Sequence, residues 1–268
     1  APSFEGPMSK KLTVKDILGC KGKRKLTEIY THTPLEAEAC EEAGIDMIIT
    51  SELNHYQRIR AAAPDTFLTV GLSYGRHLDE YQILKRAFEL ANEGADAIYC
   101  PQSPRFIKAI SDEGIPVVGH SGFVPYKSTH YGGFKAFGKT AKEAQYILDE
   151  IMRIQDAGAF AVELEIIPSE VAAEIANRVG IFLIGMGSGT ACDAQYLFSD
   201  DVLGYNPGHI PRHAKVYTDT SVDFARVKAK AVNAYAEFLS DVQNKKYPDY
   251  CHEIQIDPTE LKTFKAKF

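Results

Sequence analysis

Gln155-Asp156-Ala157-Gly158-Ala159 is one of five stretches in which a helix-like run ends at a glycine and a short apolar run follows within two residues. The other four are Glu41-Glu42-Ala43-Gly44-Ile45, Asn92-Glu93-Gly94-Ala95, Asp112-Glu113-Gly114-Ile115 and Asn177-Arg178-Val179-Gly180-Ile181. Glycine commonly caps the C-terminal end of a helix, and a buried strand after it completes an α–β joint. The recurrence therefore predicts a fold built from repeated α–β units.

The apolar runs after these joints, and similar runs elsewhere, are short and rich in Val, Ile and Ala without clean polar alternation. Such runs are typical of parallel strands covered on both faces. Seven are predicted as strands: Leu26–Tyr30, Asp46–Thr50, Phe67–Leu72, Ala95–Cys100, Pro116–Gly119, Phe160–Ile166 and Ile181–Gly185. A weaker eighth covers Gln195–Phe198. Eight strands alternating with helices predict an α/β fold, a closed (β/α)8 TIM barrel.

Amphipathic stretches of helical period lie between these runs, most clearly at Leu78–Ala91, Ala141–Ile154 and Ser169–Arg178. Thr140 with Glu143 three residues later forms a capping box, which supports a helix start at that point.

The composition and spacing predict one barrel domain over residues 8–268 with a helical extension from about residue 205. The extension contains a long predicted helix near Ser221–Lys245 and a polar tail expected to pack on the outside. Residues 1–7 precede a methionine and are interpreted as a cloning remnant, so they are excluded from the fold prediction.

The charge and cysteine content narrow the class of protein. The chain has 30 basic and 36 acidic residues and a net charge of −6, with no basic stripe, which argues against a nucleic-acid partner. No apolar run is long enough to cross a membrane. The five cysteines are scattered, so a reducing cytoplasm is expected, and Cys100 at a strand end is expected to be packed and inert.

Glu163 and Glu165 give the sharpest functional signal. Residues two apart on a strand face the same side, and a barrel collects its chemistry at the C-terminal ends of its strands. If both carboxyls face the interior, the pKa of one should rise, which suits a general acid or base. In the alternative interpretation the pair faces outward and binds Lys or Arg.

Other strand ends and loops supply candidates of lower specificity. Gly185-Met186-Gly187-Ser188-Gly189 either cradles an anion or makes a tight turn. His120 is interpreted as a hydrogen-bonding residue rather than a metal ligand. The polar segment Val124–Thr140 is predicted to be a loop over the barrel mouth or an oligomer contact. The candidate substrate-binding residues are Ser51, Glu52, Tyr99, His120, Lys127 and His32.

Two motifs resemble a known family. Gly119-His120-Ser121-Gly122-Phe123-Val124-Pro125 and Gly132-Gly133-Phe134-Lys135-Ala136-Phe137-Gly138-Lys139-Thr140 are similar to the G-H-x-G-x-x-P and G-G-[YF]-K-x-x-G-[KR] stretches of ketopantoate hydroxymethyltransferases. The likeness continues through Leu164-Glu165-Ile166-Ile167-Pro168, through Ile184–Gly189, and to Pro207-Gly208-His209-Ile210-Pro211, and it spans roughly residues 25–250.

The resemblance implies a barrel of the phosphoenolpyruvate mutase and isocitrate lyase type, usually a decamer. Its enzymes move a hydroxymethyl group from methylenetetrahydrofolate to a small 2-oxo acid chelated to Mg²⁺. The family's proposed base matches Glu165, whereas Glu163 stands where the family has an apolar residue.

The first half departs from the family at its metal ligands. Ser51 and Gly71 stand where the family has metal-binding aspartates. Tyr99 and Pro101 replace a substrate-binding lysine and a third acidic ligand, and His32-Thr33-Pro34 replaces a Y-D-Y motif. Mg²⁺ is normally held through carboxylates, so no Mg²⁺ site is expected here.

Three functional hypotheses follow. The first is a divergent enzyme of this family in which Glu165 abstracts a proton beside a carbonyl and a C–C bond then forms or breaks. In this hypothesis His120, Tyr99, His32 or Lys127 replaces the metal's contribution, and methylenetetrahydrofolate stays a candidate co-substrate. The second is a metal-independent lyase or hydrolase that uses Glu163 and Glu165 as an acid–base pair. The third is a non-catalytic oligomeric scaffold or small-molecule sensor.

Overall fold

The computed structural model of the protein describes residues 11–133 and 136–267. The interpreted remnant 1–7, together with Phe134 and Lys135 of the predicted mouth loop, lies outside the described residues. Eight parallel strands close into a barrel in sequence order, each bonded to the next and β8 to β1, which confirms the predicted (β/α)8 fold. They are β1 (Leu26–Tyr30), β2 (Met47–Ser51), β3 (Phe67–Gly71), β4 (Ala97–Tyr99), β5 (Val117–Gly122), β6 (Ala161–Glu165), β7 (Phe182–Met186) and β8 (Ala194–Phe198).

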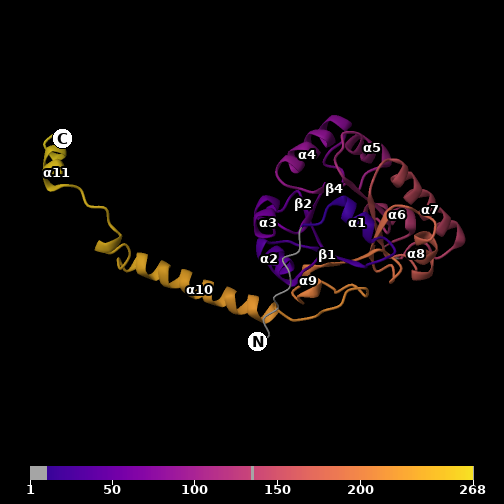
Figure 1. Cartoon of the computed structure of the whole chain (residues 1–268). Helices are drawn as coiled ribbons and strands as arrows, with labels where there is room; N and C mark the ends of the chain where they lie inside the picture. The colour runs from indigo at the N-terminus through magenta and orange to yellow at the C-terminus, as the bar shows by residue number, and fades with distance from the viewer. Residues whose placement is uncertain (1–10, 134–135, 268) are drawn as a thin grey trace. The chain divides into compact units, whose positions relative to one another are not determined.

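Helices follow most of the strands and surround the barrel, as Figure 1 shows. They are α2 (Pro34–Ala43), α3 (Tyr56–Ala62), α4 (Glu80–Asn92), α5 (Pro104–Asp112), α7 (Ala141–Asp156), α8 (Ser169–Ala176) and the short α9 (Ser199–Val202). The helix α1 (Val14–Cys20) precedes β1, and its Ile17 packs into the barrel lumen against residues such as Leu26 and Phe67. Leu26 and Phe67 are the first residues of β1 and β3. Helix α1 therefore covers the end of the barrel opposite the strands' C-terminal ends.

The apolar core has two parts, as expected for strands that are covered on both faces. One cluster packs the outer faces of the strands against the helices, with fully buried Ile48, Leu68 and Val162. The other fills the lumen with side chains such as Met47 and Phe182. Apolar side chains thus fill the lower lumen, and barrel proteins place their chemistry at the other end, where the strands' C-terminal ends lie.

The glycine joints behave largely as predicted. Gly44, Gly94, Gly114 and Gly158 have φ angles of 77°, 104°, 80° and 94°, a left-handed conformation that favours glycine. Gly180 is not among the residues with positive φ, so the fifth joint is made without that conformation. The predicted capping box forms: the Thr140 side chain accepts from the N–H of Glu143, and the Glu143 carboxylate accepts from the N–H of Thr140.

Two features differ in detail from the prediction. Strand β5 continues to Gly122 instead of ending at Gly119, because its backbone pairs with β6 as far as the Gly122–Glu165 register. The predicted mouth loop Val124–Thr140 contains two short helices, η1 (Pro125–Lys127) and α6 (Ser128–Tyr131). The first correction matters for function, since it places His120 inside the strand, beside Glu163 on β6.

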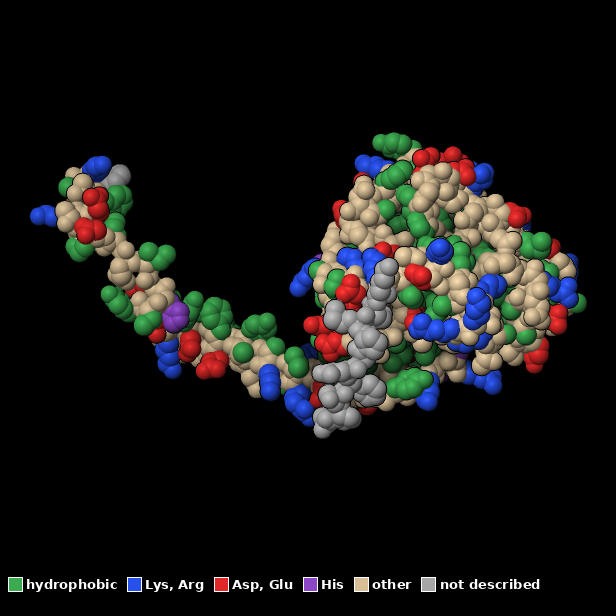
Figure 2. Space-filling model, viewed as in Figure 1, with side chains coloured by type: hydrophobic (Ala, Val, Ile, Leu, Met, Phe, Trp, Pro, Cys, Tyr) green, Lys and Arg blue, Asp and Glu red, His purple; other side chains and the backbone are tan. Residues whose placement is uncertain are grey.

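Contacts divide the chain into two compact units, one ending at Tyr217 and one over Thr218–Phe268. The second unit contains α10 (Ser221–Gln243), η2 (Tyr250–His252) and α11 (Pro258–Lys265). The assignment of residues 8–268 to one barrel domain stays a prediction. No helix in the described part of the chain is both long and apolar enough to cross a bilayer. Figure 2 shows both basic and acidic side chains on the face of the barrel unit in view.

Candidate active site

A pocket of about 630 Å³ opens at the C-terminal ends of the strands. Every strand except β3 contributes a side chain to it, and β3 contributes the bare backbone of Gly71. The segments after β2, β3, β4, β5, β6 and β8 complete it. The lining includes Tyr30, Ser51, Gly71, Ser73, Tyr74, Tyr99, Pro101, His120, Tyr126, Glu163, Glu165, Met186, Tyr196, Phe198, Asp201 and His213. The pocket therefore lies where barrel proteins place their chemistry.

His120 lies between the two glutamates of β6. Its Nδ1 is 3.3 Å from Oε2 of Glu163, and its Nε2 is 3.3 Å from Oε2 of Glu165. Both carboxyl side chains face the pocket, and Glu163 is 4% exposed. The three groups thus form a continuous carboxylate–imidazole–carboxylate arrangement on β5 and β6.

The charge state of His120 follows from its partners. Burial alone lowers the pKa of an imidazole, but hydrogen bonds and charges from Glu163 and Glu165 outweigh it and raise the pKa of His120 to about 10. His120 is therefore a cation at neutral pH, with both ring nitrogens protonated. Nε2 donates to the backbone carbonyl of Phe123 at 2.8 Å, and Nδ1 lies 3.0 Å from the Tyr99 hydroxyl.

Tyr99 has a hydroxyl that lines the pocket and accepts a hydrogen bond from the His120 imidazolium. Burial and the charges of Glu163 and Glu165 raise its pKa well above the ordinary value, so Tyr99 stays protonated. Since its oxygen is the acceptor in the contact with His120, the phenolic hydrogen is free to be donated into the pocket.

A further carboxyl, on Glu28 of β1, lies deeper in the lumen. Glu28 is 1% exposed, and both its Oε2 and Oε1 of Glu163 are buried without a hydrogen-bond partner in the structure. Burial, and then the charge of Glu163, raises the pKa of Glu28 well above the ordinary value. Burial also raises the pKa of Glu163. Glu28 is therefore a neutral acid beneath the pocket.

Backbone contact fixes the position of Glu165. Gly122 has a φ of 95°, and a Cβ added there would lie 2.4 Å from the carbonyl oxygen of Glu165. The N–H of Phe123 donates to this same carbonyl at 2.8 Å. The end of β5 can approach Glu165 this closely only because residue 122 has no side chain.

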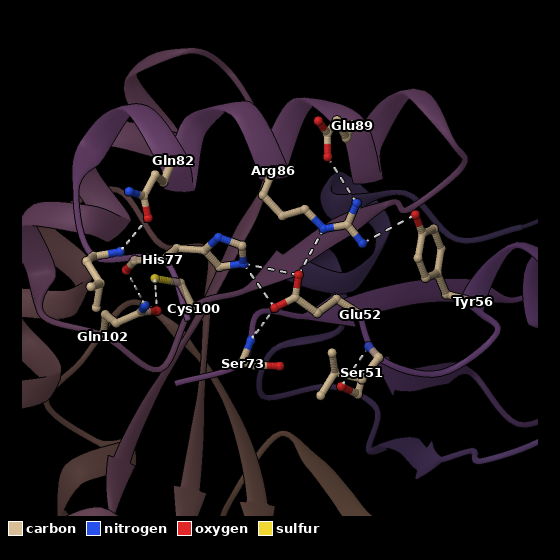
Figure 3. Close-up of polar contacts among 12 residues, drawn as sticks. Ser51, Glu52, Tyr56, Ser73, His77, Gln82, Arg86, Glu89, Cys100 and Gln102 are labelled. Carbon is tan, nitrogen blue, oxygen red and sulfur yellow. Dashed lines mark hydrogen bonds and ion pairs between the residues drawn. The ribbon is translucent and has the colours of Figure 1, made fainter. Parts of the chain in front are cut away.

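Of the predicted substrate-binding residues, Ser51, Tyr99 and His120 line the pocket, whereas Glu52, His32 and Lys127 are not in its lining. The Glu52 carboxylate points toward Ser73, His77 and Arg86 (Figure 3). It accepts hydrogen bonds from the Ser73 N–H at 2.8 Å and from Arg86 Nε at 2.9 Å, and lies 3.0 Å from His77 Nε2. Burial opposes its ionisation, but these hydrogen bonds hold the pKa of Glu52 below its ordinary value. Glu52 thus ties the loop after β3 to α4.

The other two have partners outside the pocket. His32 Nε2 lies 3.4 Å from Asp200 Oδ1, and the Lys127 ammonium donates to Glu150 Oε1 at 3.0 Å. The Cys100 thiol is fully buried, and burial raises its pKa to about 12, so it carries no thiolate at neutral pH.

The structure adds lining residues that the sequence prediction missed, among them Tyr196, Asp201 and His213. His213 packs against the predicted anion cradle: a Cβ on Gly187 would lie 2.9 Å from the Cβ of His213. The cradle is therefore covered by the segment after β8. No sequence pattern marked these three residues, because they lie beyond or within the weakest predicted strand.

The fold and the pocket together define a (β/α)8 barrel protein with a charged carboxylate–imidazole centre at its mouth. Residues 50–250 match the family model of ketopantoate hydroxymethyltransferase. The 3-methyl-2-oxobutanoate hydroxymethyltransferase of Thermosipho melanesiensis is 30% identical over 90% of this chain and 98% of that protein. An enzyme of that name from Methylibium petroleiphilum is 30% identical over 96% of this chain and 94% of its own length. The chain belongs to the ketopantoate hydroxymethyltransferase family.

Solved structures agree on the fold. A 2,3-dimethylmalate lyase of the phosphoenolpyruvate mutase and isocitrate lyase superfamily has a TM-score of 0.51 at 12% identity, covering 96% of this chain and 99% of that one. A phosphonopyruvate hydrolase has a TM-score of 0.52 at 12% identity, covering 96% of each chain. At this identity the likeness concerns the barrel alone.

Proposed function

We propose that this protein removes a proton beside a carbonyl group, with Glu165 as the base, and then forms or breaks a C–C bond by hydroxymethyl transfer or an aldol-type step. One observation carries the proposal: the Glu165 carboxylate faces the pocket beside an imidazolium and a tyrosine hydroxyl. The relatives' name, which denotes hydroxymethyl transfer to an oxo-acid, supports the same reaction class.

The chemistry begins when a Glu165 oxygen takes the proton from the carbon next to the carbonyl. The electrons of the broken C–H bond move into the enolate, and negative charge develops on the carbonyl oxygen. The free phenolic hydrogen of Tyr99 is the donor for that oxygen. Because Tyr99 accepts from the His120 imidazolium, the positive charge strengthens the donor. One such donor contributes about 10²–10³ in rate.

The family's Mg²⁺ does not fit the residues present. Ser51, Gly71 and Pro101, which stand at the family's metal-ligand positions, all border the pocket, and none has a carboxylate. The neighbouring Glu52 carboxylate is bound to Arg86 and His77. Within residues 11–133 and 136–267, no three His, Cys, Asp or Glu side chains are placed to share a metal ion. We therefore propose a reaction that needs no Mg²⁺.

We further propose methylenetetrahydrofolate as one-carbon donor and a small carbonyl compound as acceptor. A homo-oligomeric assembly such as a decamer and a cytoplasmic location are proposed from the family resemblance.

The alternative, an acid–base pair of Glu163 and Glu165, is distinguished by the place of His120. Our proposal gives Glu163 the task of holding His120 charged, because its Oε2 is 3.3 Å from Nδ1. Glu163→Gln should then slow the reaction because His120 is less readily protonated, as a substitution that removes the His120 charge would. In the acid–base alternative it should abolish the return of a proton to the product while leaving the first abstraction intact.

Exchange of the carbon-bound proton with solvent deuterium tests the base directly. The full chain is incubated in D2O with 3-methyl-2-oxobutanoate or its uncharged amide, with and without a chelator, and NMR follows the CH signal. We expect exchange that survives chelation and falls at least 100-fold in Glu165→Gln, whose fold is checked by circular dichroism. Undiminished exchange in that variant would contradict the role of Glu165. Binding of a probe without any exchange would favour the sensor hypothesis.

A further inference from the structure

The charged groups of the pocket lining are mainly acidic. Glu163, Glu165 and Asp201 supply three carboxylates, and none of the described lining residues is a lysine or an arginine. Positive charge in the lining depends on His120 and His213. The His120 charge is already offset by two carboxylates at 3.3 Å each. A substrate carboxylate would therefore meet more negative than positive charge.

Two cations close to the pocket in the fold are engaged elsewhere. The Lys127 ammonium binds Glu150, a carboxylate that also accepts from the Ser121 hydroxyl at 2.7 Å. The Arg86 guanidinium binds Glu52 and Glu89, as Figure 3 shows. Withdrawing either side chain from its partner would leave a carboxylate without its counter-charge.

The walls of the pocket are aromatic on two sides. The rings of Tyr74 and Tyr126, after β3 and β5, stack at 4.2 Å. The rings of Tyr30 on β1 and Phe198 on β8 stack at 4.8 Å, and Tyr196 stacks on Phe198 at 5.4 Å. Aliphatic lining residues fill the space between these walls: Ile49, Leu72, Val124, Ile166 and Met186. Such walls favour contact with an apolar or flat group.

From this distribution of charge and ring faces we infer that the substrate is an uncharged carbonyl compound with an apolar or aromatic body, rather than an anionic oxo-acid. The inference rests on the proposed function, in which the carbonyl oxygen meets Tyr99 and the adjacent C–H meets Glu165. The body of such a compound would contact the uncharged aromatic and aliphatic walls.

Binding measurements separate this inference from the reaction itself. Calorimetry at about pH 8, where an ordinary imidazole is uncharged, compares 3-methyl-2-oxobutanoate with its amide, which has nearly the same shape and no charge. The titrations use the full chain and its Glu165→Gln variant, which lacks the base. That variant also has one negative charge fewer, so it favours the anion and makes the comparison stringent. We expect the amide to bind at least tenfold more tightly to both proteins.

A charge placed on the pocket rim provides a matched control. Leu53 is 62% exposed and lines the pocket, whereas Leu35 is 70% exposed on α2 and does not. We expect Leu53→Lys to reduce the preference for the amide at least threefold and Leu35→Lys to leave it unchanged.

Tighter binding of the oxo-acid, or binding of neither probe, would overturn the inference even if proton exchange occurs. Binding of the amide without any exchange would support the inference and contradict the proposed function. An equal effect of the two lysine variants would show that the preference does not arise in the pocket.

Discussion

Replacing Tyr99 by phenylalanine is the most direct test of how this protein would stabilise an enolate. The change removes one oxygen, 3.0 Å from Nδ1 of His120, and keeps the ring that meets the imidazole edge to face at a centroid distance of 6.0 Å. His120 keeps its contacts with Glu163 and Glu165, so the base and its neighbouring charge remain in place.

The expected loss is that of a single donor to a developing negative charge. Removing one such donor costs about 10²–10³ in rate, or roughly 2.7–4 kcal/mol of transition-state stabilisation. The loss should fall on the rate constant and hardly on probe affinity, because the neutral carbonyl of the bound substrate gains less from the donor than the enolate does. The free energy of unfolding should decrease by about 1 kcal/mol, the usual net value of one hydrogen bond.

Deuterium exchange of the bound probe, followed by NMR, measures the rate, and calorimetry measures the affinity. Tyr74→Phe is the matched control, because Tyr74 also lines the pocket but stacks on Tyr126 and has no contact with His120 among the described interactions. Exchange in Tyr99→Phe within threefold of the unmodified protein would refute the reasoning. So would an equal loss in both variants.

Three further outcomes are expected. Glu28→Leu removes a buried oxygen without a partner, so denaturant titration at pH 7 should show a free energy of unfolding about 1–3 kcal/mol higher, whereas Leu at the exposed Glu38 should give no gain. Folding raises the pKa of His120 from an ordinary value of about 6.5 to about 10. The protonated imidazole therefore contributes fully to the free energy of unfolding below pH 6.5, and this contribution is lost as the pH rises through 10. Urea titrations over this pH range should show a smaller decline in stability for His120→Gln. Glu52→Gln should lower the free energy of unfolding by about 3 kcal/mol, since Arg86 loses its buried partner, and should leave amide binding intact. Lost amide binding with unchanged thermal stability would instead show that Glu52 takes part in substrate binding.

The strands could be predicted from the sequence because each buried run follows a helix that ends in a recognisable way. The sequence predicts too short a strand for β5, since Gly119 and the polar residues after it resemble a turn. In the fold, a Cβ at position 119 would lie 2.5 Å from a methyl of Ile154, so the glycine allows a helix to approach a continuing strand. Gly119 is therefore needed because another element packs closely against it, and this contact cannot be read from the sequence.

The site was predictable only in part for a related reason. Spacing placed Glu163 and Glu165 on one face, and the strand-end rule brought His120 near them. Nothing in Leu26-Thr27-Glu28-Ile29-Tyr30 shows which face turns to the lumen, because barrel strands are covered on both sides. The sequence therefore does not mark Glu28 as a site residue. It predicts Glu52 as a substrate-binding residue, although this residue lies in the turn after β2 and its carboxylate binds Arg86.

The missing side chain at Gly122 has a consequence for how this pocket can change. The reactive carboxylate is located by main-chain atoms of two adjoining strands, whereas the surrounding surfaces are made of tyrosines and aliphatic groups on separate loops. Mutations can therefore re-line the chamber for new molecules without displacing its proton acceptor. A larger residue at position 122 would have the opposite effect, because it would displace the Glu165 carboxylate while the lining of the chamber stays the same.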